Sequence, residues 1–332
     1  MQINGFNETI IVPFFHAEDS KIGLLRKSLI DRGALRDFLN TPQFPYIDSI
    51  DLALTAQVRE ISNLDKQGKL GSLIVSLNVS GKLLSEIQVP EIVRRFLDWV
   101  KLQLITNGAS EWLPSVYSLL ILSKTDPTNI KDNLIGDKKL LASFVFAEVP
   151  TDTHFTEEAI ETLMEQTSYL ENDLYCFSPY GSLVYDTNLV RSQKYLDAQI
   201  IPRIADFRAM QAFFETLSKS LNEKIGDEQI SKHSKSAFQE ITRLRVTSLK
   251  ALASIEYSRR LTHLADVSEK LTKMFGLKDL QASIEHKVDA LNSITQALGD
   301  LRNQKIQTRL TWANVFLAAI TGLLALLALL HF

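Results

Sequence analysis

The chain of 332 residues contains one cysteine, Cys176, nine prolines and thirteen glycines. A single cysteine excludes an internal disulfide framework and is typical of a reducing compartment. Because Cys176 lies in an apolar run with no histidine or lysine beside it, we expect a buried, unreactive thiol. The few prolines and glycines leave no segment with the composition of a long disordered tract.

An excess of positive charge is also missing. The formal net charge is −3, so the sequence has no broad basic field and does not predict nucleic acid as a partner. The opening residues MQINGFNETI lack the basic and apolar regions of a secretory signal, and we expect none. With 45% apolar and 23% charged residues, the composition is that of a globular protein, long enough for two or more domains.

Catalytic motifs are absent as well. Ser80-Gly81-Lys82 resembles the end of a phosphate-binding loop, but Ser76 and Leu83 occupy the positions where that loop needs glycine and a hydroxyl. A tight turn after a strand is the better interpretation. The chain has no Gly-x-Ser-x-Gly elbow, no dinucleotide fingerprint and no Cys-x-x-Cys pair, and its six histidines lack metal-ligand spacing. We therefore expect no enzyme activity, no cofactor and no metal site.

The first half of the chain has the pattern of an α/β domain, assigned to residues 1–187. Pro13 predicts that the run Thr9–Phe15 is an edge strand or a strand end. Pro90 opens a predicted helix, and Thr156 is the expected N-cap of another. The remaining predicted strands are Leu73–Val79, Val116–Leu122, Leu140–Val149 and a hairpin within Leu174–Tyr185.

The period then becomes helical, and residues 188–311 are predicted to form a helical bundle or coiled-coil stalk. From Leu277 onward, apolar residues occupy heptad a and d positions, among them Leu291 and Leu298. Lys287 interrupts this pattern at one d position. Either it sets the register or oligomer state, or its ammonium group reaches past the seam to water.

The third region lacks charge altogether. No charged residue occurs within Trp312–Leu330, and a helix over this range would be roughly 28 Å long. The sequence therefore predicts a single C-terminal transmembrane helix over residues 312–330, with the lipid bilayer as a partner. Trp312, Lys305 and Arg309 lie at its start, so the positive-inside rule places the bulk of a tail-anchored, single-pass protein in the cytoplasm.

Four residues of this segment are candidates for contacts between copies. Ala318 and Gly322 form a small-xxx-small pair that allows close helix approach. Asn314 would either bond across helices or face lipid headgroups. Asn314 and Thr321 are about two turns apart and share a face, which would line the path if several copies formed a pore. Together with Trp312, Lys287, Leu291 and Leu298, they are the predicted membrane and oligomer interface.

The order of these regions resembles that of the CorA-type cation transporters. The matching parts are the α/β segment to Tyr185, the helices from Asn188 and the rod Leu277–Leu330; the second transmembrane helix and the Gly-Met-Asn signature are not in the chain. The end of the rod, with Arg309-Leu310-Thr311-Trp312, is also similar to single-anchor proteins of the meiotic-nuclear-division family, which end in a coil and one membrane helix.

Two functional hypotheses follow, beside a third class, an enzyme held at the membrane, for which the sequence offers no motif. The first is a non-enzymatic, oligomeric, membrane-tethered protein whose α/β domain binds a ligand or protein partner and signals to or scaffolds at the membrane. The second, which the CorA resemblance implies, is an ion pore or membrane-disrupting assembly with one helix per subunit. The first is favoured because the anchor has only a thin polar stripe.

Overall fold

The computed structural model describes residues 2–15, 19–41, 47–65, 68–122, 130–147, 156–167, 173–186, 195–225, 246 and 265–330. The chain divides into two compact units. The α/β unit comprises Met1–Thr216 and Leu249–Gln281, and the helical unit comprises Leu217–Ser248 and Ala282–Phe332.

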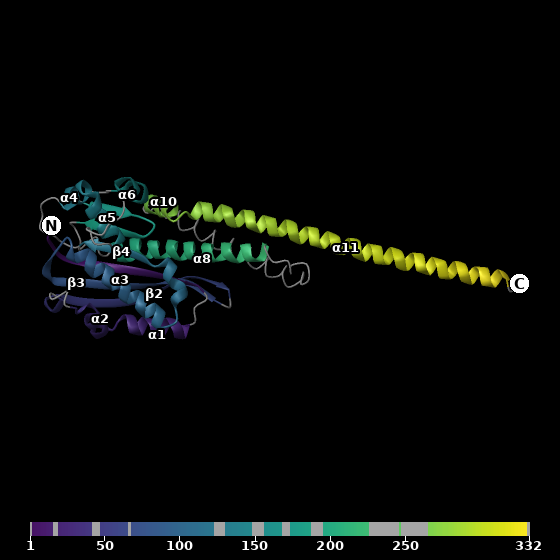
Figure 1. Ribbon diagram of the computed structural model, residues 1–332, viewed down its shortest axis with the longest axis horizontal. Coiled ribbons are helices and arrows are strands. Elements are labelled where there is room, and N and C mark those ends of the chain that lie inside the picture. The colour runs from purple at the N-terminus through teal and green to yellow at the C-terminus, as the bar shows by residue number, and fades with distance from the viewer. Residues whose placement is uncertain are drawn as a thin grey trace. The chain divides into compact units, whose positions relative to one another are not determined.

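The α/β unit is built on a mixed seven-stranded sheet in the order β2-β3-β1-β4-β7-β6-β5 (Figure 1). The strand β4 pairs with β7 in parallel, and the other neighbours are antiparallel. The strands are β1 (Gln2–Phe15), β2 (Asp51–Asp65), β3 (Gly68–Ser85), β4 (Tyr117–Leu122), β5 (Glu165–Thr167), β6 (Asp173–Phe177) and β7 (Gly181–Asp186).

Two predictions about strand ends are corrected by the register. For Thr9–Phe15, the edge-strand alternative was wrong, because β1 lies between β3 and β4. The strand-end alternative is confirmed, because β1 ends at Phe15, two residues after Pro13. Pro13 is tolerated because the pairing with β4 runs only from Phe6 to Ile11, which leaves the proline with β3 alone as a neighbour. The expected tight turn at Gly81 is instead an irregularity within β3, where the residue has a φ of +101°.

One face of the sheet is covered by helices from the first half of the chain. These are α1 (Asp19–Leu29), α2 (Arg32–Leu39), α3 (Gln88–Thr106) and α5 (Lys138–Phe146), whose apolar residues join those of the strands in one core cluster. The helix α3 begins with reciprocal hydrogen bonds between Ser85 and Gln88, the arrangement of a capping box. Its predicted apolar stripe is confirmed: Ile92, Val93, Phe96, Trp99, Val100 and Leu104 are all buried.

The segment Leu140–Val149 was predicted as a strand, and this was wrong. Its described residues form α5, which begins at the N-cap Asp137 and ends at Ala147 in the left-handed conformation. The side chain of Asp137 accepts a hydrogen bond of 2.9 Å from the backbone amide of Leu140. A nearly all-apolar helix and a buried strand have the same composition, so the N-cap residue is the only sequence signal that distinguishes them here.

Shorter elements connect these helices and strands. They are η1 (Ile47–Ser49), η2 (Ser110–Ser115), α4 (Ile130–Gly136) and α6 (Glu157–Leu163). The predicted N-cap of α6 is confirmed, since Thr156 Oγ1 accepts a hydrogen bond of 3.2 Å from the amide of Ala159.

The opposite face of the sheet is covered by the first part of α8 (Ile201–Ile225), which follows the π-helix η3 (Leu196–Ile200), and by α10 (Ala265–Met274). Arg208 of α8 donates to the carbonyl of Ser115 at 2.8 Å and lies over the rings of Tyr117 and Phe275, at 5.8 and 5.4 Å from their centroids. The buried guanidinium is thus held by a carbonyl and two aromatic faces. The sequence also predicts a long helix from about Ser234 to Phe275, of which only residue 246 and the part from 265 onward lie within the described residues.

The helical unit contains the end of α8 and most of α11 (Leu277–Leu330), which is one unbroken helix as predicted. Leu217 and Leu221 of α8 are buried, as are Ile284 and Val288 of α11. Lys287 donates a hydrogen bond to Ser218, which links the two helices. The seam of α11 is therefore occupied at this point by a helix of the same chain.

The predicted transmembrane helix over residues 312–330 is not supported. Within the part of the chain that the structure describes, no helix is long and apolar enough to cross a membrane. The prediction of a single-pass, tail-anchored membrane protein with its bulk in the cytoplasm was therefore wrong.

Candidate functional site

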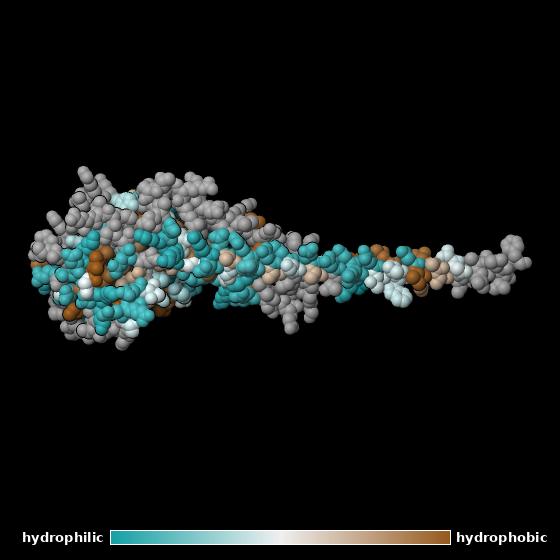
Figure 2. All heavy atoms as spheres, turned by 90° about the horizontal axis from the view of Figure 1, so that it is seen from above, coloured by the Kyte–Doolittle hydropathy of each residue, from teal (hydrophilic) through white to brown (hydrophobic). Residues whose placement is uncertain are grey.

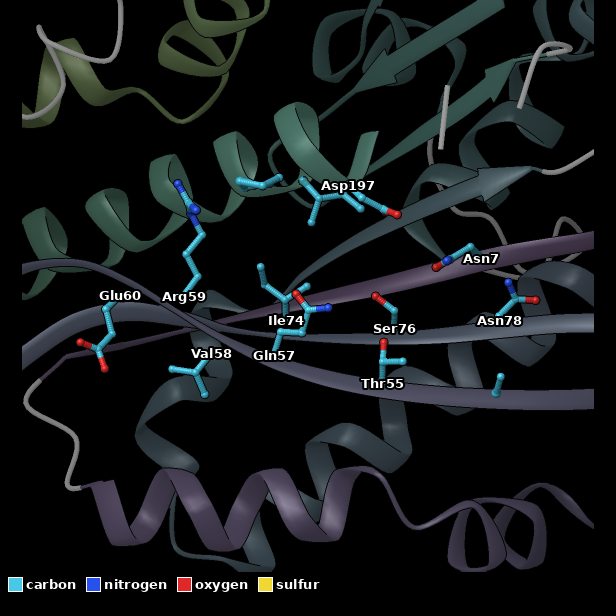
Figure 3. A pocket seen from close by; sticks show the side chains of 13 residues that line it. Asn7, Thr55, Gln57, Val58, Arg59, Glu60, Ile74, Ser76, Asn78 and Asp197 are labelled. Atoms are coloured by element: carbon cyan, nitrogen blue, oxygen red, sulfur yellow. The ribbon is translucent and has the colours of Figure 1, made fainter. Parts of the chain in front are cut away.

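On the face of the sheet that α8 covers, the strands β1, β2 and β3 carry a polar hollow beside the start of that helix (Figure 3). Its volume is about 740 Å³. Most of its lining side chains come from alternate positions of the three strands, because successive residues of a strand point to opposite faces. The lining residues are Asn7, Ala53, Thr55, Gln57, Val58, Arg59, Glu60, Ile74, Ser76, Asn78, Asp197, Ile201 and Pro202.

The floor of the hollow is a ladder of hydroxyl and amide side chains. Ser76 is the cross-strand neighbour of both Thr9 and Thr55, and Asn78 is the neighbour of Asn7. The hydroxyls of Thr9 and Ser76 are 2.9 Å apart, and Thr9 Oγ1 also donates to Asn7 Oδ1 at 3.2 Å. Thr55 and Asn78 are exposed, so their donors and acceptors are available to a ligand.

An ion pair closes one end of the hollow. Arg59 of β2 donates from Nε and a terminal nitrogen to the two carboxylate oxygens of Asp206 in α8, at 2.6 and 2.7 Å. The hydrogen bond with Asp206 raises the pKa of Arg59. Nearby, burial lowers the pKa of Arg203, against the attraction of Asp206. The charge of Arg59 is thus neutralised by a partner of the same unit.

The hollow therefore offers hydrogen bonding. Its neutral floor provides hydroxyl and amide groups that both donate and accept. Within the described residues, no three His, Cys, Asp or Glu side chains are placed to hold a metal ion. The single thiol is buried within β6, donates to the sulfur of Met164 at 3.7 Å, and has its pKa raised to about 12 by burial. The prediction of a buried Cys176 is confirmed.

The opposite face of β1 carries a buried carboxyl group. Glu8 Oε1 accepts a hydrogen bond of 2.6 Å from Ser118 of β4, whereas Oε2 is buried without a hydrogen-bond partner among the described residues. Burial raises the pKa of Glu8 to about 8, although hydrogen bonds from Ser118 and from the backbone of Leu119 lower it. This carboxyl is protonated at neutral pH and lies in the core, away from the hollow.

The residues predicted as an interface lie elsewhere, on α11. Trp312 is 69% exposed, and Asn314, Ala318, Thr321 and Gly322 are exposed too. The hydroxyl of Thr321 donates to the carbonyl of Leu317 on its own helix. A methyl group added at Gly322 would meet nothing within 4 Å. Close helix packing at these positions stays a prediction.

Of the other predicted interface residues, only Lys287 has a described side chain. Lys287 bonds to Ser218 rather than reaching past the seam to open water. Leu291 and Leu298 belong to α11, but their side chains lie outside the part that the structure describes, and their role in an oligomer seam stays a prediction.

Sequence reasoning missed the hollow because it missed β2. The signal was present, since Leu52, Leu54 and Ala56 are buried and alternate with exposed Ala53, Thr55 and Gln57. Without β2, the polar residues of β1 and β3 had no neighbouring strand to form a site with.

No family model, curated protein or solved structure matches the chain.

Proposed function

We propose that this chain is a non-enzymatic interaction protein that self-associates through α11 and binds a ligand or partner in its α/β unit. The observation that carries the proposal is a stripe of exposed apolar side chains on α11. Ile306, Leu310, Leu317 and Ile320 are between 45 and 63% exposed, and their spacing places them on one face of the helix.

This stripe continues an interface that the chain already uses. Ile306 follows Val288 by about five helical turns, so both residues point in the same direction from the helix axis. Around Val288 and Ile284 that face is buried, and Lys287 bonds to Ser218 of α8 there. Farther along, the same face is exposed, and Figure 2 shows hydrophobic residues among the hydrophilic ones on this helix.

The occupant that fits this stripe is a second copy of the chain. Contiguous exposed apolar side chains, unlike single scattered ones, mark an interaction site. Two copies of α11 would cover equivalent stripes with one symmetric contact, which is the commonest way in which soluble proteins form oligomers. A regular three- and four-residue spacing from Leu310 through Ala313 to Leu317 and Ile320 matches helix-on-helix packing.

The test is the mass of the full chain in solution. We expect oligomers of the unmodified protein in sedimentation velocity, and a shift to monomers when Leu310→Asp and Leu317→Asp place carboxylates in the seam. The matched control is Thr308→Asp, which introduces a carboxylate on the other side of the same helix and leaves the mass unchanged. A monomeric unmodified protein, or a double variant that keeps the oligomer mass, would contradict the proposal.

A further inference from the structure

A second cavity adjoins the polar hollow. It has a volume of about 480 Å³ and is lined by Arg32, Gly33, Arg36, Asp51, Leu52, Ala53, Asn78 and Ser80. Ala53 and Asn78 line both cavities, so the two form one continuous groove across β2 and β3. From Asp51 to Gln57 the groove follows β2 for roughly 20 Å, at about 3.3 Å per residue.

The end of this groove beside α2 is lined by two arginines. Arg32 and Arg36 are four residues apart on α2 and line the same cavity from one side of the helix. Arg36 donates through one terminal nitrogen to the carbonyl of Ile50 at 3.2 Å, and its other donors have no partner among the residues that the structure describes. Arg32 is exposed and forms no ion pair with any residue that the structure describes.

One carboxylate, that of Asp51, lines the same cavity. Two guanidinium groups against one carboxylate leave this end net positive. The hydroxyl of Ser80 and the amide of Asn78 add uncharged donors beside the arginines. Paired guanidinium groups bind phosphate oxygens through parallel charge-assisted hydrogen bonds.

We propose that the groove binds a phosphate ester of a polar, uncharged organic body. Arg32 and Arg36 hold the phosphate, and the ladder of Asn78, Ser76 and Thr55 hydrogen-bonds the body along the sheet. In Figure 3 these three side chains project from neighbouring strands into the hollow. Nucleotides and sugar phosphates share this chemistry. The inference rests on the binding role proposed above for the α/β unit and is independent of α11.

The experiment is a calorimetric titration of the full chain with adenosine monophosphate, glucose 6-phosphate, inorganic phosphate, adenosine and glucose. We expect at least one of the two esters to bind, and inorganic phosphate and both uncharged compounds to bind at least about tenfold more weakly than it. The better ester identifies the source of the ligand. Weakening of that binding by added salt is expected from the charged contact.

Three variants locate the ligand. Arg32→Gln and Arg36→Gln each lower the affinity for the ester about tenfold, whereas the matched control Lys27→Gln, which removes an exposed charge of α1 away from the groove, leaves it unchanged. Asp51→Asn raises the affinity because it removes a repelling charge. Thermal melting of each variant shows whether a loss of ester affinity is caused by unfolding. If an arginine variant is unfolded, the groove proposal is judged by whether Asp51→Asn raises the affinity for the ester.

Several results would overturn the inference. They are the failure of both esters to bind, binding that Arg32→Gln and Arg36→Gln do not weaken, and inorganic phosphate binding as tightly as the esters. The titration is repeated with the Leu310→Asp, Leu317→Asp variant. If both proposals hold, this variant is monomeric and still binds the ester. An unmodified chain that is monomeric but binds an ester shows that the self-association has failed, and an unmodified oligomer that binds no ester shows that the groove proposal has failed.

Discussion

Arg59 and Asp206 join β2 to α8 through two parallel hydrogen bonds of 2.6 and 2.7 Å, although 147 residues separate them in the chain. The side chain of Arg59 is 40% exposed and that of Asp206 is 19% exposed. A second bond between the same face of the sheet and α8 is made by the buried Ser72, whose hydroxyl donates to the carbonyl of Ala205 at 3.0 Å. Together these contacts place the helix over the sheet and define one wall of the hollow.

The first prediction concerns this ion pair. We expect a double-mutant cycle with Arg59→Gln and Asp206→Asn to give a coupling free energy of about 1 kcal/mol in urea unfolding, toward the upper end for partly exposed pairs because the geometry is bidentate. The coupling should decrease at high salt. Additive effects of the two substitutions would show that the pair does not stabilise the contact between sheet and helix.

The second prediction concerns the pH dependence of stability. Between the ordinary carboxyl pKa of 4.5 and the native value of about 8, the folded chain retains a proton on Glu8 that the unfolded chain has lost. The contribution of this group to the free energy of unfolding therefore falls as pH rises through this window, by at most about 1.4 kcal/mol per pH unit, and levels off above pH 8.

Glu8→Gln removes this titration, so the free energy of unfolding of the variant should depend less on pH. Compared with the unmodified chain, the variant should therefore be more stable at pH 8 than it is at pH 5. Urea unfolding of both proteins at pH 5, 6.5 and 8 measures the difference. Ser118→Ala is the companion variant: it removes the donor to Oε1 and should cost about 1–3 kcal/mol. Parallel pH profiles for Glu8→Gln and the unmodified chain would contradict the assignment.

The third prediction concerns a glycine at a close approach of two backbones. A Cβ atom at Gly181 would lie 2.1 Å from the carbonyl oxygen of Val145, so Gly181→Ala should force β7 away from α5 and cost about 3 kcal/mol. Gly23→Ala is the matched control, since Gly23 is in α1 and an added Cβ meets nothing within 4 Å. It should stabilise the protein by about 0.5–1 kcal/mol. Similar melting temperatures for the two variants would disagree with this geometry.

The fourth prediction uses the single thiol. Cys176 is fully buried and its pKa is raised to about 12, so a thiol reagent at pH 8 should not modify the native chain within minutes. In denaturant the same reagent should modify one thiol per chain. Rapid modification without denaturant would show that β6 opens readily, and its rate would measure that opening.

Several elements could be predicted from the sequence because their signals are local. The apolar stripe of α3, the N-cap at Thr156 and the continuity of α11 are all properties of neighbouring residues. The helix α5 is different, because its run of apolar residues fits a buried strand equally well. The N-cap Asp137 was the only local sign of a helix there, and such a cap stabilises a helix by only about 1 kcal/mol.

The groove could not be predicted, for a physical reason. Its arginines belong to α2 and its hydroxyl and amide groups to β1, β2 and β3, so the site exists only through the register of three strands and the position of a helix. The transmembrane prediction for Trp312–Leu330 failed for a different reason. It inferred a lipid environment for the helix from the hydrophobicity of its residues alone.

The interior position of β1 has a consequence for synthesis on the ribosome. This strand is made before both of its partners, β3 and β4, and the pairing of Phe6 with Leu122 requires more than a hundred further residues. At about 5–20 residues per second, the wait is roughly 5 to 20 s. Ile10, Ile11 and Val12, all fully buried in the finished sheet, have no partner strand until residues 73–75 of β3 are made, and transiently exposed apolar segments of this kind are prone to aggregation.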